Sequence, residues 1–146
     1  MATVCYLDTN IFLNVIYAEP LYSKGSSSLL QRIQEGKLAG ITSSVTETEI
    51  GLDMAKTGST EKIDEALRLL ERMQNLEITS LSSLAARLAL RLVLERRLTV
   101  HDAYHVATAL EGKASVFVTR DRHLQRKLQG LLYASEPERI DSDQKV

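Results

Sequence analysis

Short, largely apolar runs alternate with longer helical segments along this chain of 146 residues, and this alternation is the strongest constraint on its fold. Runs of this length are typical of strands buried on both faces of a parallel sheet. The helical segments between them would join the strands by right-handed crossovers. We therefore predict an α/β fold, a three-layer helix–sheet–helix sandwich around a mainly parallel sheet. The predicted strands are residues 3–7, 38–42, 76–79, 115–119 and 131–134.

The chain is long enough for one domain with a buried core, and no linker or repeat divides it. We predict a single domain over residues 1–137, followed by a polar, frayed tail over residues 138–146. The longest apolar stretches are too short to span a bilayer, so no membrane association is expected. Cys5, the only cysteine, lies in the first apolar run and is typical of a core residue in a cytoplasmic protein.

Two of the predicted strands lead directly to an acid. VCYL is followed by Asp8, and VFVT is followed one residue later by Asp121. In parallel sheets, ligands gather at the carboxyl ends of the strands, so both side chains would lie at one edge. Each acid could instead be the N-cap of the helix that follows it. Asn10 could cap the first of these helices equally well, which would leave Asp8 without a structural task.

The stretch SSVTETEI offers two glutamates that helix geometry separates. Residues 44–47 match a capping box, which accounts for Glu47 structurally. Glu49 shares a helical stripe with Val45 and Leu52, and its side chain would lean back toward the strand ends. We therefore expect Glu49 to be the functional acid, although a second apolar pair later in the helix leaves its inward face undecided.

The segment HDAYHVATAL places a carboxylate on the apolar side of a helix. Asp102 falls inside an arc that is otherwise apolar on a helical wheel. A carboxylate that faces the core is rare unless it is paired or binds a metal, so we expect Asp102 to belong to a site. The alternative is an acid in the first helical turn, after an N-cap at Thr99, which explains the residue type but not its inward direction. The arc comprises Ala103, Val106, Ala107, Ala109 and Leu110.

His101 and His105, four residues apart, resemble the histidine pair of a zinc hydrolase motif. Both fall outside the apolar arc, and no nearby residue offers an evident third ligand. We therefore do not expect zinc, because that motif requires its helical face to line a cleft.

Four acids that converge on one edge would need a cation. Like charges about 4 Å apart repel by roughly 4 kcal/mol at an effective dielectric near 20. Such a cluster either takes up protons or binds a cation, and oxygen ligands favour Mg²⁺ or Mn²⁺. The chemistry indicated is metal-assisted hydrolysis of a phosphodiester. Polar neighbours would orient the acids by hydrogen bonds. The acids are Asp8, Glu49, Asp102 and Asp121, and the polar neighbours are Thr9, Asn10 and Thr119.

Four segments together resemble the PIN-domain family, in particular the VapC-type toxin ribonucleases and their solitary relatives. They are YLDTNIFL, SSVTETEI, LTVHDAYHVATAL and VFVTRDRHL, in this order and over nearly the whole chain. The resemblance implies a five-stranded parallel sheet, dependence on Mg²⁺ or Mn²⁺, and endonucleolytic cleavage of RNA. It carries the acidic quartet of the family onto Asp8, Glu49, Asp102 and Asp121, and its polar supports onto Asn10 and Thr119, with Thr9 beside the first acid.

The resemblance also implies a function and partners. The expected protein is a metal-dependent endoribonuclease, the toxin of a toxin–antitoxin pair, whose small antitoxin occludes the site. The alternatives are a solitary RNA-processing nuclease of this family, a structure-specific DNA nuclease and a non-catalytic interaction module. The intact set of four acids argues against the module, since an inactive scaffold has no reason to tolerate their repulsion.

Two surfaces have open interpretations. The segment LAARLALRLVLERRL is apolar except for a stripe at Arg87, Arg91 and Glu95, so it requires neighbours on several sides. These neighbours are either other helices of the domain or a second copy of the chain, and the resemblance favours a homodimer. Arg120 and Arg122 lie beside the predicted edge, where they either hold phosphates of the substrate or belong to a solvated helix face.

Overall fold

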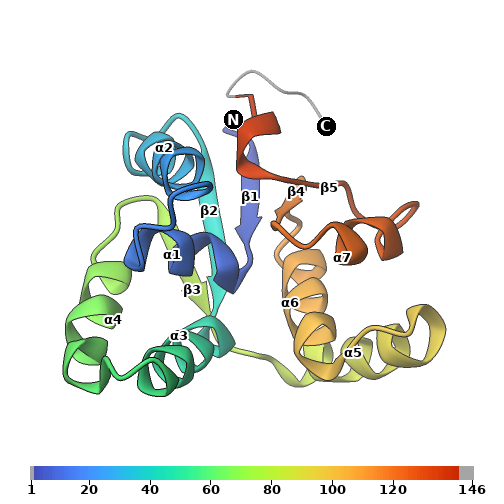
Figure 1. The fold of residues 1–146 in the computed structure, drawn as a ribbon. Helices are drawn as coiled ribbons and strands as arrows, with labels where there is room; N and C mark the ends of the chain where they lie inside the picture. The colour runs from blue at the N-terminus through green and yellow to red at the C-terminus, as the bar shows by residue number, and fades with distance from the viewer. Residues whose placement is uncertain (1, 142–146) are drawn as a thin grey trace.

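A five-stranded parallel sheet forms the centre of the computed structural model, which describes residues 2–141 (Figure 1). The strands are β1 (Val4–Leu7), β2 (Ala39–Ser43), β3 (Leu76–Thr79), β4 (Val116–Val118) and β5 (Ala134–Ser135). Their order across the sheet is β3-β2-β1-β4-β5, so β1 lies in the middle. The predicted α/β fold with a parallel sheet is confirmed. The last strand is shorter and begins later than predicted.

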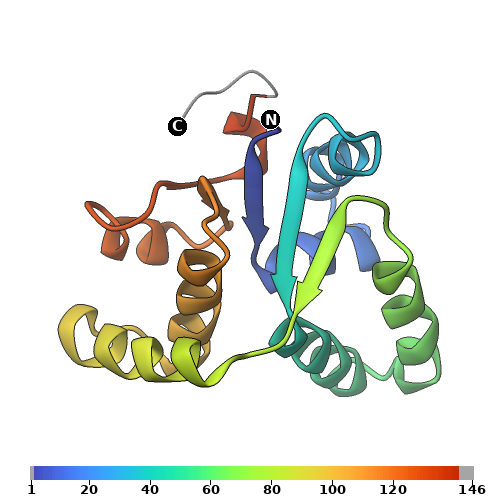
Figure 2. The ribbon, with the colours of Figure 1, turned by 180° about the vertical axis from the view of Figure 1, so that it is seen from behind.

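Helices cover both faces of this sheet (Figures 1 and 2). The α-helices are α1 (Thr9–Ile16), α2 (Ser23–Gln34), α3 (Ser44–Lys56), α4 (Ile63–Glu71), α5 (Ser83–Arg96), α6 (Val100–Glu111) and α7 (Arg122–Lys127). Short 3-10 turns form η1 (Thr60–Lys62) and η2 (Pro137–Arg139). One core lies between the sheet and α1–α4, and a second lies between the sheet and α5–α7. This is the predicted three-layer sandwich.

The central strand contributes to both cores because its side chains alternate between the faces of the sheet. Cys5 and Leu7 belong to the core under α1–α4, whereas Tyr6 belongs to the core under α5–α7. The Tyr6 ring stacks on Phe117 of β4, with ring centroids 5.2 Å apart and an angle of 12° between the planes. Cys5, Tyr6 and Leu7 are all fully buried.

Strand register brings the residues that follow β1 and β4 together. Leu7 pairs with Val118, and the Asp8 amide donates a hydrogen bond of 3.0 Å to the Val118 carbonyl. Asp8 and Thr119 therefore lie side by side at the carboxyl ends of their strands. In Figure 2 these strand ends lie at the edge of the sheet that α3 and α5 approach.

Helix α3 begins differently from the prediction. Its N-cap is Ser43, whose hydroxyl accepts a hydrogen bond of 3.0 Å from the Val45 amide. The capping box predicted over residues 44–47 therefore does not describe this helix start. Glu47 instead lies beside Glu71 of α4, and burial together with the neighbouring Glu71 carboxyl raises the pKa of Glu47.

The C-terminal segment packs against α2. Ile140, which follows η2, is only 3% exposed. Glu138 lies so close to α2 that a Cβ on Gly25 would be 2.1 Å from its Oε1 atom. The tail was predicted from residue 138, but the described part of it is packed as far as Ile140. The rest of that prediction, residues 142–146, lies outside the described residues.

Two expectations from composition concern the core and the membrane. Cys5 is fully buried, and burial raises the pKa of its thiol to about 12, which makes it an inert core residue. Over residues 2–141, no helix is both long and apolar enough to cross a bilayer.

Candidate active site

Asp8 is a buried carboxylate at the end of the central strand. It is 7% exposed and is the N-cap of α1, with Oδ1 accepting a hydrogen bond of 2.8 Å from the Thr9 amide. Its other oxygen, Oδ2, accepts from the Thr119 hydroxyl at 2.8 Å. Burial raises the pKa of Asp8, and His105 and these hydrogen bonds partly offset that effect. Asp8 therefore caps α1 and also contacts polar residues of the predicted site.

Asn10 connects the ends of β1 and β4. Its Nδ2 donates to the Thr119 hydroxyl at 3.1 Å and to Asp8 Oδ2 at 3.3 Å. Its Oδ1 accepts from the Arg120 amide at 3.2 Å. Asn10 is thus inside α1 rather than its cap, and its amide side chain holds Asp8 against the segment that leads to Asp121.

Glu49 reaches the same place from α3. Its Oε1 accepts from the Thr9 hydroxyl at 3.0 Å and also forms a short hydrogen bond with His105 Nε2. Burial by itself would raise the pKa of Glu49, but the hydrogen bond and positive charge of His105 bring it below its ordinary value. The choice of Glu49 over Glu47 therefore agrees with its position beside Asp8.

Asp102 and Asp121 complete the group of acids. Asp102 lies in the first turn of α6, where its amide donates to the N-cap Thr99 at 3.2 Å. Burial raises the pKa of Asp102, and the negative charges of Asp8 and Asp121 raise it further. Asp121 is the exposed N-cap of α7 and accepts a hydrogen bond of 3.0 Å from the Leu124 amide. Electrostatic interactions thus connect Asp8 with Glu49 and with Asp102, and Asp102 with Asp121.

His105 is a member of this group that sequence reasoning missed. It is 1% exposed, its Nδ1 lies 2.7 Å from the Tyr6 hydroxyl, and its Nε2 lies 3.8 Å from Asp8 Oδ1. The helical wheel placed it outside the core-facing arc, which was wrong because α6 packs against both α5 and the sheet. A usable signal was present, since residues three apart share a helix face and His105 follows Asp102 by three.

His101 stays at the rim of the site. Its side chain is 69% exposed, and its Nδ1 lies 3.9 Å from Glu49 Oε2. In the part of the chain that the structure describes, no three His, Cys, Asp or Glu side chains form a ready group for a metal ion. Mg²⁺ does not require one, because it keeps several waters and takes one or two carboxylates. The carboxylate oxygens of these acids are the type of donor that a hard divalent cation prefers, so the chemistry of the residues fits Mg²⁺ or Mn²⁺.

The two arginines predicted to bind substrate differ in position. The Arg120 guanidinium is turned away from the acids and lies over the Tyr22 ring, 4.6 Å from its centroid. It donates hydrogen bonds to Asn14, Ser26, Glu138 and the Tyr22 carbonyl. The structure therefore does not bring its charge to the acidic group. The Arg122 side chain is 78% exposed and lies 3.4 Å from Glu136.

Known proteins share both sequence and fold with this chain. A family model described as PIN domain matches residues 5–129. A chain of VapBC2 from Rickettsia felis, solved with a promoter DNA fragment, has a TM-score of 0.71 at 19% identity over 92% of this chain and 98% of that chain. A chain of FitAcB from Neisseria gonorrhoeae has a TM-score of 0.69 at 18% identity over 93% and 99%.

A third structure, a toxin–antitoxin complex from Klebsiella pneumoniae, has a TM-score of 0.67 at 20% identity over 93% of this chain and 99% of that chain. At these identities the likeness is one of fold. Among curated proteins, none matches the chain in sequence.

The charge crowding around Asp102 leads to a prediction for stability. In the metal-free protein, Asp102→Asn should raise the melting temperature, by about 2–4 °C for each ~1 kcal/mol of repulsion that is relieved. The folded-state pKa of Asp102 is raised, so its ionisation destabilises the fold as pH increases. The gain should therefore shrink as pH falls and vanish below 3.8, the ordinary value, because below it the wild-type carboxyl is protonated in both states.

Thermal unfolding followed by circular dichroism measures this gain, with melting curves recorded from pH 4 to 8 in steps of about one pH unit. Glu77→Gln, at an exposed position of β3, is the matched control and should leave the melting temperature unchanged. A lower melting temperature for Asp102→Asn would mean that the helix-start interaction of this carboxylate outweighs its repulsion from Asp8 and Asp121.

Proposed function

The chain belongs to the PIN-domain family, a family of nucleases, and on this premise we propose that it is a metal-dependent endoribonuclease, the toxin of a toxin–antitoxin pair. The observation that carries the proposal is the buried Asp8 carboxylate, gathered with Glu49, Asp102 and Asp121 at the carboxyl edge of the sheet. We further propose that it acts in the cytoplasm, where the single buried Cys5 would remain a thiol.

The four acids are the proposed ligands of Mg²⁺ or Mn²⁺. When bound, such an ion acidifies water and neutralises the charge that develops on the phosphodiester. The protein contributes fixed positions. Thr9, Asn10 and Thr119 hold Asp8 and Glu49 by hydrogen bonds, so these carboxylates keep their geometry when charge builds up nearby.

RNA is the proposed substrate because of the resemblance to ribonucleases of this family. The net charge of −1 and the low aromatic content, 5% of residues, do not favour a broad nucleic-acid platform. They agree with an enzyme that engages a few nucleotides at one local site. Arg122, exposed next to Asp121, is a candidate contact for a phosphate.

Asp8→Asn tests the nuclease proposal. Asn also caps helices, so the variant should fold with an equal or higher melting temperature. Its cleavage of single-stranded RNA in Mg²⁺ or Mn²⁺ should fall by more than about 100-fold, since losing even a supporting group of a metal site costs 10–100-fold. Gel assays with matched RNA and DNA oligonucleotides measure both activity and substrate class.

Three results of this assay would contradict the proposal in different ways. Preferential cleavage of DNA would identify a DNA nuclease. Cleavage that persists in the presence of a chelator would contradict the proposed dependence on a metal ion. No cleavage by the wild type, combined with no heat of Mn²⁺ binding in calorimetry, would favour the interaction module.

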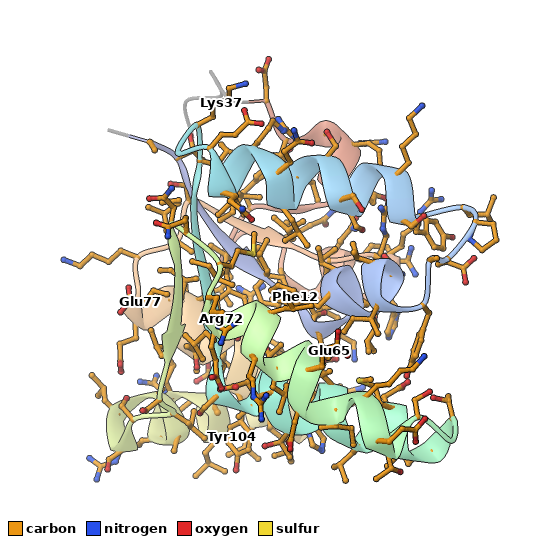
Figure 3. The ribbon with its side chains drawn as sticks, turned by 90° about the vertical axis from the view of Figure 1, so that its left-hand side faces the viewer. Phe12, Lys37, Glu65, Arg72, Glu77 and Tyr104 are labelled. Carbon is orange, nitrogen blue, oxygen red and sulfur yellow. The ribbon has the colours of Figure 1, made fainter. Side chains whose placement is uncertain are left out.

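An apolar groove supports the proposed antitoxin partner. It has a volume of about 400 Å³ and lies between α1, α3 and α4, beside Phe12 and Glu65 in Figure 3. Leu69 at this groove is 64% exposed, which invites the apolar face of a partner helix. Ile50 of α3, the helix that also carries Glu49, lines the groove. A similar structure, from Klebsiella pneumoniae, is a toxin–antitoxin complex, which makes a small antitoxin the proposed occupant.

A short reading frame directly upstream of this gene should encode the partner, a small protein with a basic DNA-binding region. Co-expressed with the wild type, it should co-purify and suppress RNA cleavage. Leu69→Asp should weaken the complex by at least about 10-fold, since burying an unpaired charge costs several kcal/mol. Leu21→Asp, at a 79% exposed leucine outside the groove, is the matched control. Equal binding by both variants would exclude the groove.

Helix α5 supports the proposed homodimer. It packs on α6 through Ala85, Ala89 and Leu92, which are buried. Its outer face presents leucines that are 60–72% exposed, alternating with the predicted charged stripe. A second copy that repeats the same face about a two-fold axis would cover them. The exposed leucines are Leu84, Leu90 and Leu94.

Light scattering after gel filtration tests this surface. The wild type should elute at twice the mass of the 16.3 kDa chain. The double variant Leu90→Glu/Leu94→Glu should elute as a monomer with an unchanged circular dichroism spectrum, because two carboxylates would then face their copies. Leu21→Glu serves as the control for an exposed leucine elsewhere. A wild type that stays monomeric at about 100 μM, well above a micromolar dissociation constant, would contradict the dimer.

A further inference from the structure

A histidine lies buried among the acids of the proposed site. His105 is 1% exposed, forms a short hydrogen bond with Glu49 Oε1, and lies 3.8 Å from Asp8 Oδ1. A buried imidazole must have partners for both ring nitrogens, since an unpaired buried polar group costs free energy. Here one nitrogen faces the acids, and the other faces the Tyr6 hydroxyl at 2.7 Å.

The hydrogen bond with the Tyr6 hydroxyl determines which ring nitrogen of His105 is the acceptor and which is the donor. Tyr6 is fully buried in the central strand between His105 and Phe117, with the His105 ring edge-on at a centroid distance of 5.8 Å. A phenol keeps its proton at neutral pH, so Tyr6 can donate to Nδ1. His105 Nε2 then carries the hydrogen of the neutral ring, and it carries one in the protonated ring too, so it donates to Glu49 in either charge state.

We propose that His105 is a positioning residue for Glu49: it holds Oε1 of this carboxylate, and Tyr6 in turn holds the imidazole. This inference rests on the proposed function, because it gives Glu49 a geometry in which it can bind the cation. Thr9 donates to the same Oε1 at 3.0 Å. Oε2 is then the oxygen left for a cation, with only His101, at 3.9 Å, approaching it among the described residues in ion-pair range.

Glu49 needs a partner that holds its side chain in place because it lies near the negative charge of Asp8. Glu49 has a long, flexible side chain that is 26% exposed, and the negative charge of Asp8 repels it. Without a partner it would turn toward solvent, where it regains rotamer freedom and hydration. The hydrogen bond from His105 opposes this movement and keeps the two carboxylates at the same edge. Removing it should therefore weaken cation binding more than it weakens the fold.

Calorimetric titration of the metal-free, full-length chain with Mn²⁺ tests the role directly. His105→Leu removes the donor and should lower Mn²⁺ affinity by about 10–100-fold, the usual cost of losing a group that orients a metal ligand. His105→Gln keeps an N–H at a similar reach and should retain affinity within about threefold, since the charge-assisted bond to Glu49 survives. Tyr6→Phe should lie between these two variants.

Two further variants separate positioning from general packing. Thr108→Val changes another buried polar residue of α6, whose hydroxyl donates only to the Tyr104 carbonyl, and should leave Mn²⁺ affinity unchanged. If His105 acts through Glu49, the effects will not add. His105→Leu should then cause no further loss of affinity in a Glu49→Gln background.

A second readout does not use the metal. In NMR spectra of the metal-free protein, the His105 Nε2 hydrogen should give a protected imidazole N–H signal that disappears in His105→Gln and shifts in Glu49→Gln. Unchanged Mn²⁺ affinity in His105→Leu, with only a lower melting temperature, would overturn the inference and leave His105 a core residue. Absence of Mn²⁺ binding by the wild type would instead defeat the proposed function, and the NMR signal would then decide the Glu49 contact alone.

Discussion

The burial of one carboxylate, Asp8, is the constraint on which the rest of the site depends. An ionised carboxylate cannot be placed at the end of a buried central strand without partners, because its desolvation costs several kcal/mol. The chain supplies those partners from three directions: the first amide of α1, the hydroxyl of Thr119 and the amide of Asn10. These bonds also tie β1 to β4, so the same contacts that satisfy Asp8 fix the shape of the edge.

The acids at this edge of the sheet differ in the direction of their pKa shifts. Burial and like charges raise the pKa of Asp8 and Asp102, whereas His105 lowers that of Glu49. Neutral donors and one imidazole thus hold the acids, and none of the described arginine or lysine side chains pairs with them in a salt bridge. Permanent neutralisation by arginine would remove the need for a cation. An edge of this kind retains its attraction for a divalent ion.

Much of this arrangement could be predicted because its determinants are local. Apolar runs that end in an acid placed Asp8 and Asp121 at the carboxyl ends of parallel strands, whatever the exact strand lengths. The inward direction of Asp102 followed from its place among alanines on α6. The capping box at residues 44–47 failed, because two consecutive serines offered two helix starts and Ser43, one residue earlier than assumed, became the cap. Sequence pattern cannot rank two such caps that differ by one residue.

Sequence by itself determined the fold class, and it predicted the edge of the sheet and the acids that we propose for the site, since each depends on the pattern within one segment. Only the tertiary structure decided which neighbours the acids have. His105 belongs with Glu49 because α6 is enclosed by both α5 and the sheet, so a wheel with one buried face misplaces it. Arg120 turns toward α2 because Glu138, near the far end of the chain, packs there. Tyr6 with His105 and Asn14 with Arg120 are contacts between segments about a hundred residues apart, and no local pattern encodes them.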